Sequence, residues 1–272
     1  MTRAALTLTF MPVAGNVGAV AVEPPPLGAF LPDEIGQIKQ ALAEHGVVFI
    51  RSGTLDVSAH FAFASQFGTV SRPSALIASL ADEGYPDVGV ISTDNGLAYS
   101  SDRWHSDVTW SDEPSSYSIL HMQVTPPAGG DTMWSSQLAA FDALSEPTKR
   151  YLSGLTGHHN PPGRPEIAAD HPVVCVHPLS GKPSLFVNGL FTTRINELSE
   201  GESEAVLAFL ARHSTQPEFT CRWTWQPGDV AIWDNHFVQH YALGDYHPAA
   251  RRIHRIEICG SPPIPAPEVP SL

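Results

Sequence analysis

Short apolar segments, separated by turns rich in proline and glycine, fill most of the sequence after residue 87 and limit the fold more than any other feature. The segments with strand character are 87–92, 116–124, 131–135, 172–177, 183–188, 219–225, 229–234 and 251–259. An open parallel sheet needs a helix between successive strands, and most of these strands lack one. The pattern therefore predicts a mainly β fold with added helices, built on a jelly-roll core (a double-stranded β-helix of the cupin type).

Helical periodicity is confined to a few stretches. The expected helices span 32–45, 56–67 and 200–213. Asp33 is the expected N-cap of the first helix, and Ser199 with Glu202 forms a capping box for the last. The length of 272 residues fits one elaborated domain better than two. We therefore expect a single domain over 1–272, with a helical N-terminal elaboration at about 30–70 and the jelly-roll core at about 87–260.

The charge balance limits the partners of the chain. Asp and Glu number 28 against 15 Lys and Arg, which gives a formal net charge of −13 at pH 7. Because nucleic-acid phosphates require a basic surface, this balance argues against a nucleic-acid partner. The sequence also lacks an apolar run long enough to cross a membrane and a basic cluster for a membrane surface. An anionic small molecule would have to be bound by individual arginines.

The cysteines indicate the cellular compartment. The chain has three, Cys175, Cys221 and Cys259, which are odd in number and far apart. They form neither a disulfide framework nor a zinc-binding spacing. Reduced thiols of this kind favour a cytoplasmic protein.

Two distant segments carry side chains that bind metal ions. His105 and Asp107 stand at i and i+2, so that an extended backbone directs both side chains to one face. His240 is expected just past the end of the strand 229–233, where functional residues often gather. Two histidines and one carboxylate on one face of an octahedral metal leave three positions open, which is the ligand set of non-haem Fe(II) oxygenases. Zinc would more often take four ligands, and copper a third histidine or a thiolate.

The last predicted strand carries buried charge. Arg251, Ile253, Arg255 and Glu257 alternate onto one face of it. A guanidinium group on an inward face requires an anion, and a carboxylate or sulfonate fits its planar fork. From periodicity alone, ion pairs with Asp or Glu of neighbouring strands explain the two arginines equally well.

Three motifs in order resemble the Fe(II)/2-oxoglutarate-dependent dioxygenases of the taurine dioxygenase/2,4-D dioxygenase (TauD/TfdA) family. These are the His-x-Asp pair, the distal histidine and the arginines that follow it, and the similarity is strongest over 182–260. There the matching stretches are 185–188 (Leu-Phe-Val-Asn), 191–195 (Phe-Thr-Thr-Arg-Ile) and 226–235 (Gln-Pro-Gly-Asp-Val-Ala-Ile-Trp-Asp-Asn). The resemblance implies a jelly-roll oxygenase that uses Fe(II), 2-oxoglutarate and dioxygen.

The resemblance also implies a role for individual residues. His105, Asp107 and His240 would bind iron. Arg251, eleven residues after the distal histidine, would bind the far carboxylate of 2-oxoglutarate with help from Thr132. The expected substrate-binding residues are Arg255, Phe191, Ser101 and Arg72. Arg255, fifteen residues after the distal histidine, would meet an acidic substrate group and Phe191 would line the pocket.

Several readings of function follow from the same motifs. The leading one is an oxygenase that hydroxylates a small anionic organic acid and converts 2-oxoglutarate to succinate. The segment 72–75 (Arg-Pro-Ser-Ala) departs from the family's pattern, which disfavours taurine as the substrate. The alternatives are a taurine, alkylsulfonate or alkylsulfate dioxygenase proper and, in another class, a non-catalytic jelly-roll binding protein. A homo-oligomer, either a dimer or a tetramer, is implied by the resemblance.

Overall fold

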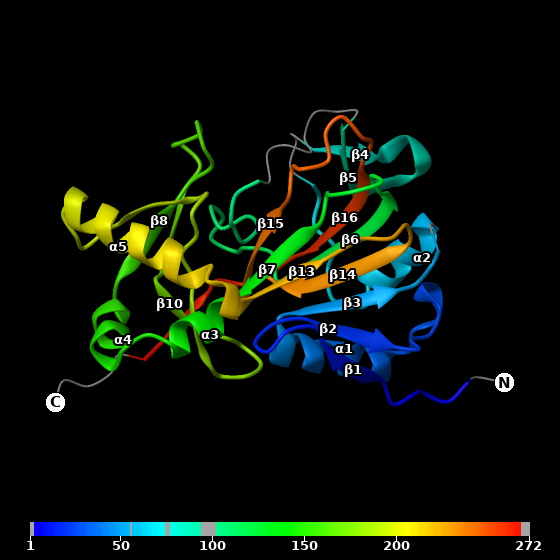
Figure 1. Cartoon of the computed structure of the whole chain (residues 1–272), viewed down its shortest axis with the longest axis horizontal. Coiled ribbons are helices and arrows are strands. Elements are labelled where there is room, and N and C mark those ends of the chain that lie inside the picture. The colour runs from blue at the N-terminus through cyan, green and yellow to red at the C-terminus, as the bar shows by residue number, and fades with distance from the viewer. Residues whose placement is uncertain (1–2, 55, 74–76, 94–101, 268–272) are drawn as a thin grey trace.

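The computed structural model describes residues 3–54, 56–73, 77–93 and 102–267, and these residues form a mainly β fold (Figure 1). The strands are β1 (Thr9–Pro12), β2 (Ala19–Val22), β3 (Val47–Arg51), β4 (Ala78–Leu80), β5 (Tyr85–Ser92), β6 (Tyr117–Val124), β7 (Thr132–Ser136), β8 (Thr156–His159), β9 (Ala169–Pro172), β10 (Val174–Val176), β11 (Pro183–Leu185), β12 (Thr192–Ile195), β13 (Thr220–Trp223), β14 (Asp229–Asp234), β15 (Val238–Ala242), β16 (Arg252–Ile258) and β17 (Ile264–Pro265). The helices are α1 (Pro32–His45), α2 (Val57–Ala64), α3 (Gln137–Asp142), α4 (Glu146–Leu152) and α5 (Glu200–Ser214).

Two facing sheets build the centre of the molecule. The larger has eight strands in the order β1-β2-β3-β14-β6-β16-β5-β4, and the smaller has the order β13-β7-β15. Large apolar side chains fill the space between them, among them Phe49 of the larger sheet and Trp134 and Trp223 of the smaller. The Phe49 ring stacks on that of Trp223 with centroids 4.1 Å apart and meets the Trp134 ring edge-on. This arrangement confirms the predicted jelly roll.

Strand β16 shows the predicted alternation. Ile253 packs between the two sheets, whereas Ile256 and Ile258 join the apolar core on the opposite face of the larger sheet. Because successive side chains of a strand point to opposite faces, Arg255 and Glu257 lie on the inner side with Ile253. Strand β16 therefore supplies the space between the sheets with both charge and apolar surface.

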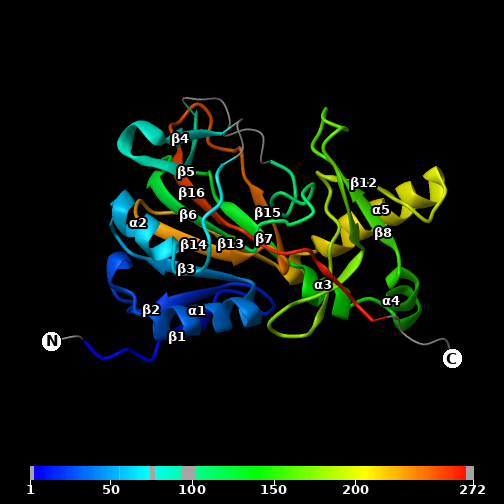
Figure 2. The same cartoon turned by 180° about the vertical axis from the view of Figure 1, so that it is seen from behind.

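Helices α1 and α2 cover the outer face of the larger sheet (Figure 2). The expectation that Asp33 caps α1 is wrong, because the helix begins at Pro32 and its N-cap position is Leu31, so that Asp33 lies inside the first turn. Proline lacks an N–H and has a φ angle suited to the first helical position. The side chain of Glu34 reaches back and accepts a hydrogen bond from the Leu31 N–H at 2.9 Å. In α2 the N-cap is Asp56, which accepts a hydrogen bond from the Ser58 N–H.

The segment between β7 and β13 adds further elements to the two facing sheets. It forms α3, α4 and α5 and, together with β17, two small three-stranded sheets (Figure 1). An apolar cluster of its own lies among these elements. The predicted strand 172–177 is divided at Val173 between β9 and β10, which pair with different partners. Helices α3 and α4 have only six and seven residues, too few for a clear period, and were not predicted.

Candidate metal centre

A direct backbone pairing brings the two predicted histidine ligands together. The N–H of His105 donates to the carbonyl oxygen of His240 at 3.0 Å, and the N–H of His240 donates to that of His105 at 2.7 Å. Residues paired in this way direct their side chains to the same face, and the two imidazole centroids lie 4.1 Å apart. His240 lies within β15, so the expectation that it follows the end of a strand on a loop is wrong.

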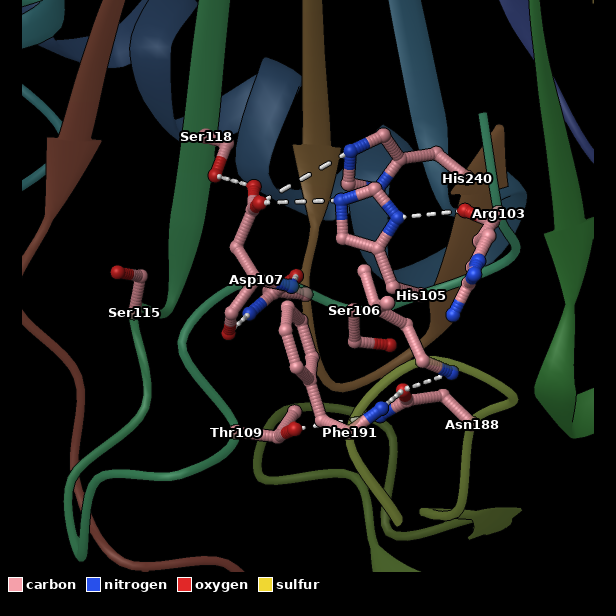
Figure 3. A network of polar contacts seen from close by, with 12 residues as sticks. Arg103, His105, Ser106, Asp107, Thr109, Ser115, Ser118, Asn188, Phe191 and His240 are labelled. Atoms are coloured by element: carbon pink, nitrogen blue, oxygen red, sulfur yellow. Dashed lines mark hydrogen bonds and ion pairs between the residues drawn. The ribbon is translucent and has the colours of Figure 1, made fainter. Parts of the chain in front are cut away.

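Asp107 completes a group of three ligating side chains. Its Oδ1 atom lies 3.7 Å from Nε2 of His105 and 3.8 Å from Nε2 of His240 (Figure 3). One ligand atom from each residue lies within 4.8 Å of the others, and all three side chains are buried. The hydroxyl of Ser118 donates to Oδ2 of Asp107 at 2.6 Å, which leaves Oδ1 directed at the histidines. Residues remote in sequence therefore converge as predicted.

The side chain of Asn235 holds the backbone of Asp107 from both sides. Its Oδ1 accepts from the Asp107 N–H at 2.8 Å, and its Nδ2 donates to the Asp107 carbonyl oxygen at 2.7 Å. The next residue, Val108, has a φ of +57°, which is unfavourable for a β-branched side chain. Such strain costs about 1–3 kcal/mol and persists only where the surroundings enforce it. We infer that the Asn235 amide enforces it here and so fixes the direction of the Asp107 side chain.

Replacing Asn235 with alanine is expected to weaken divalent-metal binding by about 10- to 100-fold, the usual range for a group that orients a metal ligand. The change leaves both Asp107 backbone groups without their buried partners and lets the Val108 backbone relax. Isothermal titration of the apoprotein with Co(II) measures the effect. Asn235→Asp keeps the acceptor but loses the donor, so its affinity should lie between those of alanine and wild type. Wild-type affinity in the alanine variant would contradict this role.

Burial and neighbouring charges set the protonation of the three side chains. Burial opposes ionisation of Asp107, but His240, Arg255 and His105 outweigh it and lower the pKa of Asp107 to about 2. Burial lowers the pKa of His240 to about 3, with His105 adding to the effect. Burial likewise lowers the pKa of His105. At neutral pH the site therefore offers a carboxylate and two neutral imidazoles, the protonation states that bind a metal ion.

The hydrogen bond of the His105 imidazole fits a metal ligand. Nδ1 of His105 lies 2.7 Å from the carbonyl oxygen of Arg103, which requires a proton on Nδ1 and leaves the Nε2 lone pair free. Nδ1 of His240 is buried and has no hydrogen-bond partner among the described residues. Two imidazole nitrogens and one carboxylate oxygen form the facial donor set of Fe(II) oxygenases. The residues present therefore fit the expected iron.

A small cavity extends from His240 to Arg251, which directly precedes β16. Ile91, Leu120, Thr132, Trp233, His240, Ala242, Arg251, Ile253 and Arg255 line it. The Arg251 guanidinium donates to the carbonyl oxygen of Gly130 at 3.0 Å and to Oγ1 of Thr132 at 3.3 Å. Gly130 has a φ of +70°, and a Cβ there would crowd Cδ of Arg251, so glycine is needed for this approach.

The charge of Arg251 is the least compensated in the cavity. The residue is 3% exposed, and no carboxylate oxygen of the described residues lies within 4.0 Å of its guanidinium. Burial lowers the pKa of Arg251, which indicates the cost of keeping this cation out of water. A buried, planar guanidinium of this kind matches a carboxylate of a bound small molecule.

Arg255 differs from Arg251, since it is paired with acidic residues. Its Nη1 lies 3.3 Å from Oδ1 of Asp107 and its Nη2 lies 3.0 Å from Oε2 of Glu257. For Arg255, the sequence left open an explanation by ion pairs with acidic residues of neighbouring strands, and such ion pairs are present. One partner, Glu257, belongs however to the same strand as Arg255. Burial raises the pKa of Glu257, against the opposing effect of Arg255.

The other expected substrate residues are placed differently. Phe191 is buried and meets the His105 ring edge-on, with centroids 5.7 Å apart, and the Trp110 ring also meets it edge-on, at 4.5 Å. Arg72 points to solvent with its side chain 83% exposed and lies 3.5 Å from Asp87, so this conformation does not support a place in the pocket. Ser101 lies outside the described residues.

Sequence reasoning did not assign Asn235, Ser118 or Glu257 a role at the site. Asn235 stands inside a matched motif, but nothing in the sequence indicates that its amide grips a residue 128 positions away. Ser118 alternates inward on β6, as many structural serines do. Glu257 shared the predicted inner face of β16, and this was the available signal.

Comparisons with known proteins agree with this geometry. Residues 9–256 match the family model described as "Taurine catabolism dioxygenase TauD, TfdA family". A sulfate ester dioxygenase of Pseudomonas putida, dependent on α-ketoglutarate (2-oxoglutarate), is 33% identical over 96% of this chain and 92% of its own. A 2,4-dichlorophenoxyacetate dioxygenase of Burkholderia sp., with the same dependence, is 30% identical over 88% of each chain.

A solved structure gives the same result for the fold. A taurine dioxygenase from Burkholderia xenovorans superposes with a TM-score of 0.85 and 35% sequence identity, over 95% of this chain and 93% of that one. The family-model match over residues 9–256 includes all three residues of the metal centre. The chain therefore belongs to the TauD/TfdA family of 2-oxoglutarate-dependent dioxygenases.

Proposed function

We propose that this enzyme hydroxylates a small anionic organic acid, using Fe(II), 2-oxoglutarate and dioxygen. The observation that carries the proposal is one cavity with two complementary ends. His240, one of the three ligating side chains, lines one end, and the buried guanidinium of Arg251, with no carboxylate oxygen of the described residues within 4.0 Å, lies at the other. A dicarboxylate that reaches from a metal ion to a guanidinium satisfies both ends at once.

Each residue of the cavity has a distinct task in this proposal. His105, Asp107 and His240 would hold the iron and leave its remaining positions to 2-oxoglutarate and dioxygen. Arg251 and the Thr132 hydroxyl would bind the far carboxylate, and the apolar walls would exclude water from it. When bound, iron and 2-oxoglutarate supply the oxidation, in which 2-oxoglutarate, dioxygen and a C–H bond give succinate, carbon dioxide and an alcohol.

The substrate class is proposed from chemistry near the metal. Phe191 and Trp110 offer an aromatic wall for the carbon skeleton, and Arg255 offers a cation for an acidic group. Similar proteins are named as acting on sulfate esters and on a phenoxyacetate, both of them monoanions with an apolar part. We therefore favour alkyl or aryl sulfates, sulfonates and aryloxy acids. Hydroxylation of the carbon that bears such a group would release it.

An anaerobic titration tests the proposal directly. Fe(II) followed by 2-oxoglutarate should give the weak visible charge-transfer band that the family resemblance implies. Succinate formation in air is then measured with a panel of alkyl sulfates, sulfonates, aryloxy acids and amino acids, against a reaction without substrate. Absence of the band in the wild-type protein would contradict the oxygenase. Anion binding without succinate would favour the alternative of a non-catalytic binding protein.

Two further expectations stay predictions. Among the described residues, no helix is long and apolar enough to span a membrane. Cys175 and Cys221 are buried free thiols and Cys259 is an exposed one, which supports a reducing, cytoplasmic location. Cell fractionation tests that location, and analytical ultracentrifugation tests the homo-oligomer that the family resemblance implies.

A further inference from the structure

Glu257 is a second buried carboxylate beside the metal centre, and the proposed reaction gives it no task. Its side chain is 6% exposed, and Oε2 lies 3.0 Å from Nη2 of Arg255. Oε1 lies 3.4 Å from the hydroxyl of Ser115, which donates to it. A carboxylate on the inner face of a strand is costly to bury unless it is paired and hydrogen-bonded, and Glu257 meets this condition through Arg255 and Ser115.

The contacts of Arg255 show what Glu257 does to its neighbour. One edge of the guanidinium faces the metal-binding oxygen of Asp107 at 3.3 Å, and another faces Glu257 at 3.0 Å. Two carboxylates thus share one cation, and the closer contact is to the one that is not a ligand. A guanidinium can bind one carboxylate through two parallel N–H groups or divide its N–H groups between two carboxylates. Because Arg255 is divided in this way, Glu257 limits how strongly Arg255 holds Asp107.

The same contact limits what Arg255 offers to a substrate. A guanidinium already paired with a carboxylate attracts a second anion less strongly, since the incoming anion is repelled by the first. The effect of Glu257 on metal affinity and its effect on anion affinity therefore have opposite signs. Through its contact with Arg255, Glu257 favours a divalent cation bound at Asp107 and disfavours a substrate anion bound at Arg255.

We propose that Glu257 is a charge-balancing, specificity-determining residue, which strengthens metal binding by drawing Arg255 away from Asp107 and weakens the grip of Arg255 on the substrate anion. Only the part of this inference that concerns the substrate anion rests on the proposed function. The consequence is a site tuned to release a hydroxylated or fragmented acid and to retain its metal.

The first measurement is metal affinity of the apoprotein, by isothermal titration with Co(II). Glu257→Gln keeps the size and one acceptor but removes the charge, and it should raise the Kd for Co(II) about tenfold, as changes beside a metal ligand commonly do. In an Arg255→Gln background the same substitution should change the Kd little, because the cation that it releases is gone. Ser115→Ala, which removes the hydroxyl that donates to Glu257 but changes no charge, is the matched control and should stay near wild type.

The second measurement is anion affinity, with hexyl sulfate as the probe and inorganic sulfate as a second anion. The protein is saturated with Mn(II) and 2-oxoglutarate without oxygen, so that no turnover occurs. Glu257→Gln should bind hexyl sulfate about threefold more tightly or better, because a competing negative charge is removed. The uncharged probe 1-hexanol should bind wild type and variant alike.

A weaker metal site together with tighter anion binding supports the proposal. Loss of both affinities together would assign Glu257 a merely structural role, and an unchanged Co(II) affinity would overturn the proposal whatever the anions do. Failure of both anions to bind either protein would also contradict it, since Arg255 would then not be an anion site. The titration with Co(II) needs no catalysis. Absence of the charge-transfer band would therefore contradict the proposed function, but the effect of Glu257 on metal affinity could still be measured.

Discussion

Replacing Asp107 with alanine is expected to remove divalent-metal binding at micromolar metal and to lower succinate formation by at least about 10³-fold. The carboxylate is the one anionic ligand of the three, and its loss leaves a divalent cation with two neutral imidazoles in a buried site beside Arg255. A catalytic metal supplies several kcal/mol of stabilisation, and each 1.36 kcal/mol corresponds to a factor of ten in rate. Titration with Co(II) and a succinate assay measure the two losses.

The backbone contacts make this substitution specific. Asn235 grips the main chain of Asp107, so the alanine variant keeps both hydrogen bonds and the local fold. Asp112→Ala, which removes an exposed carboxylate five residues further on, is the matched control and should behave as wild type. Metal-dependent turnover within tenfold of wild type in the Asp107 variant would refute the assignment of the centre.

Replacing Arg251 with alanine is expected to raise the KM for 2-oxoglutarate by about 100-fold or more. Removing one partner of a buried charge pair costs about 2–5 kcal/mol, and the far carboxylate would keep only the Thr132 hydroxyl. The metal ligands stay intact, so the Kd for Co(II) should change little. Arg251→Lys keeps the charge but not the planar fork, and its KM should lie between those of alanine and wild type.

The next residue in the chain supplies the control. Arg252 is half-buried and lies at the start of β16, on the same face of the strand as His254 and not on the face of the cavity. Arg252→Ala should therefore leave the KM for 2-oxoglutarate within about twofold of wild type, as for most changes outside a site. Equal effects of the two alanine variants would mean that Arg251 acts through the general positive charge of this region and not through a direct contact.

Much of the fold could be predicted because local pattern and long-range packing agree. Strands β6, β14 and β16 were placed within a residue or two, since proline- and glycine-containing turns and apolar runs bound them clearly. The split at Val173 and the helices α3 and α4 could not be predicted. Short elements take their form from tertiary partners, which override weak local preference.

The site divides in the same way. The residue types at 105, 107 and 240 indicate a metal centre, because positions i and i+2 of an extended segment share one face and two histidines with one carboxylate form a known ligand set. The sequence pattern predicts His240 past a strand, whereas it lies inside β15, opposite His105. The hydrogen bonding between these two backbones creates the metal centre, and no local signal reports it. Arg72 shows the converse, since this cation was expected to bind the substrate and its side chain points to solvent.

The amino-acid sequence alone determined the sheet-rich architecture, the donor atoms of the metal centre and the common face of Arg251 and Arg255, because these follow from periodicity and from the chemistry of side chains. Only the tertiary structure decided how the charges are shared: Arg251 has no carboxylate oxygen of the described residues within 4.0 Å, and Arg255 is divided between Asp107 and Glu257. Whether a buried charge is compensated depends on distances between segments that meet only in the folded chain.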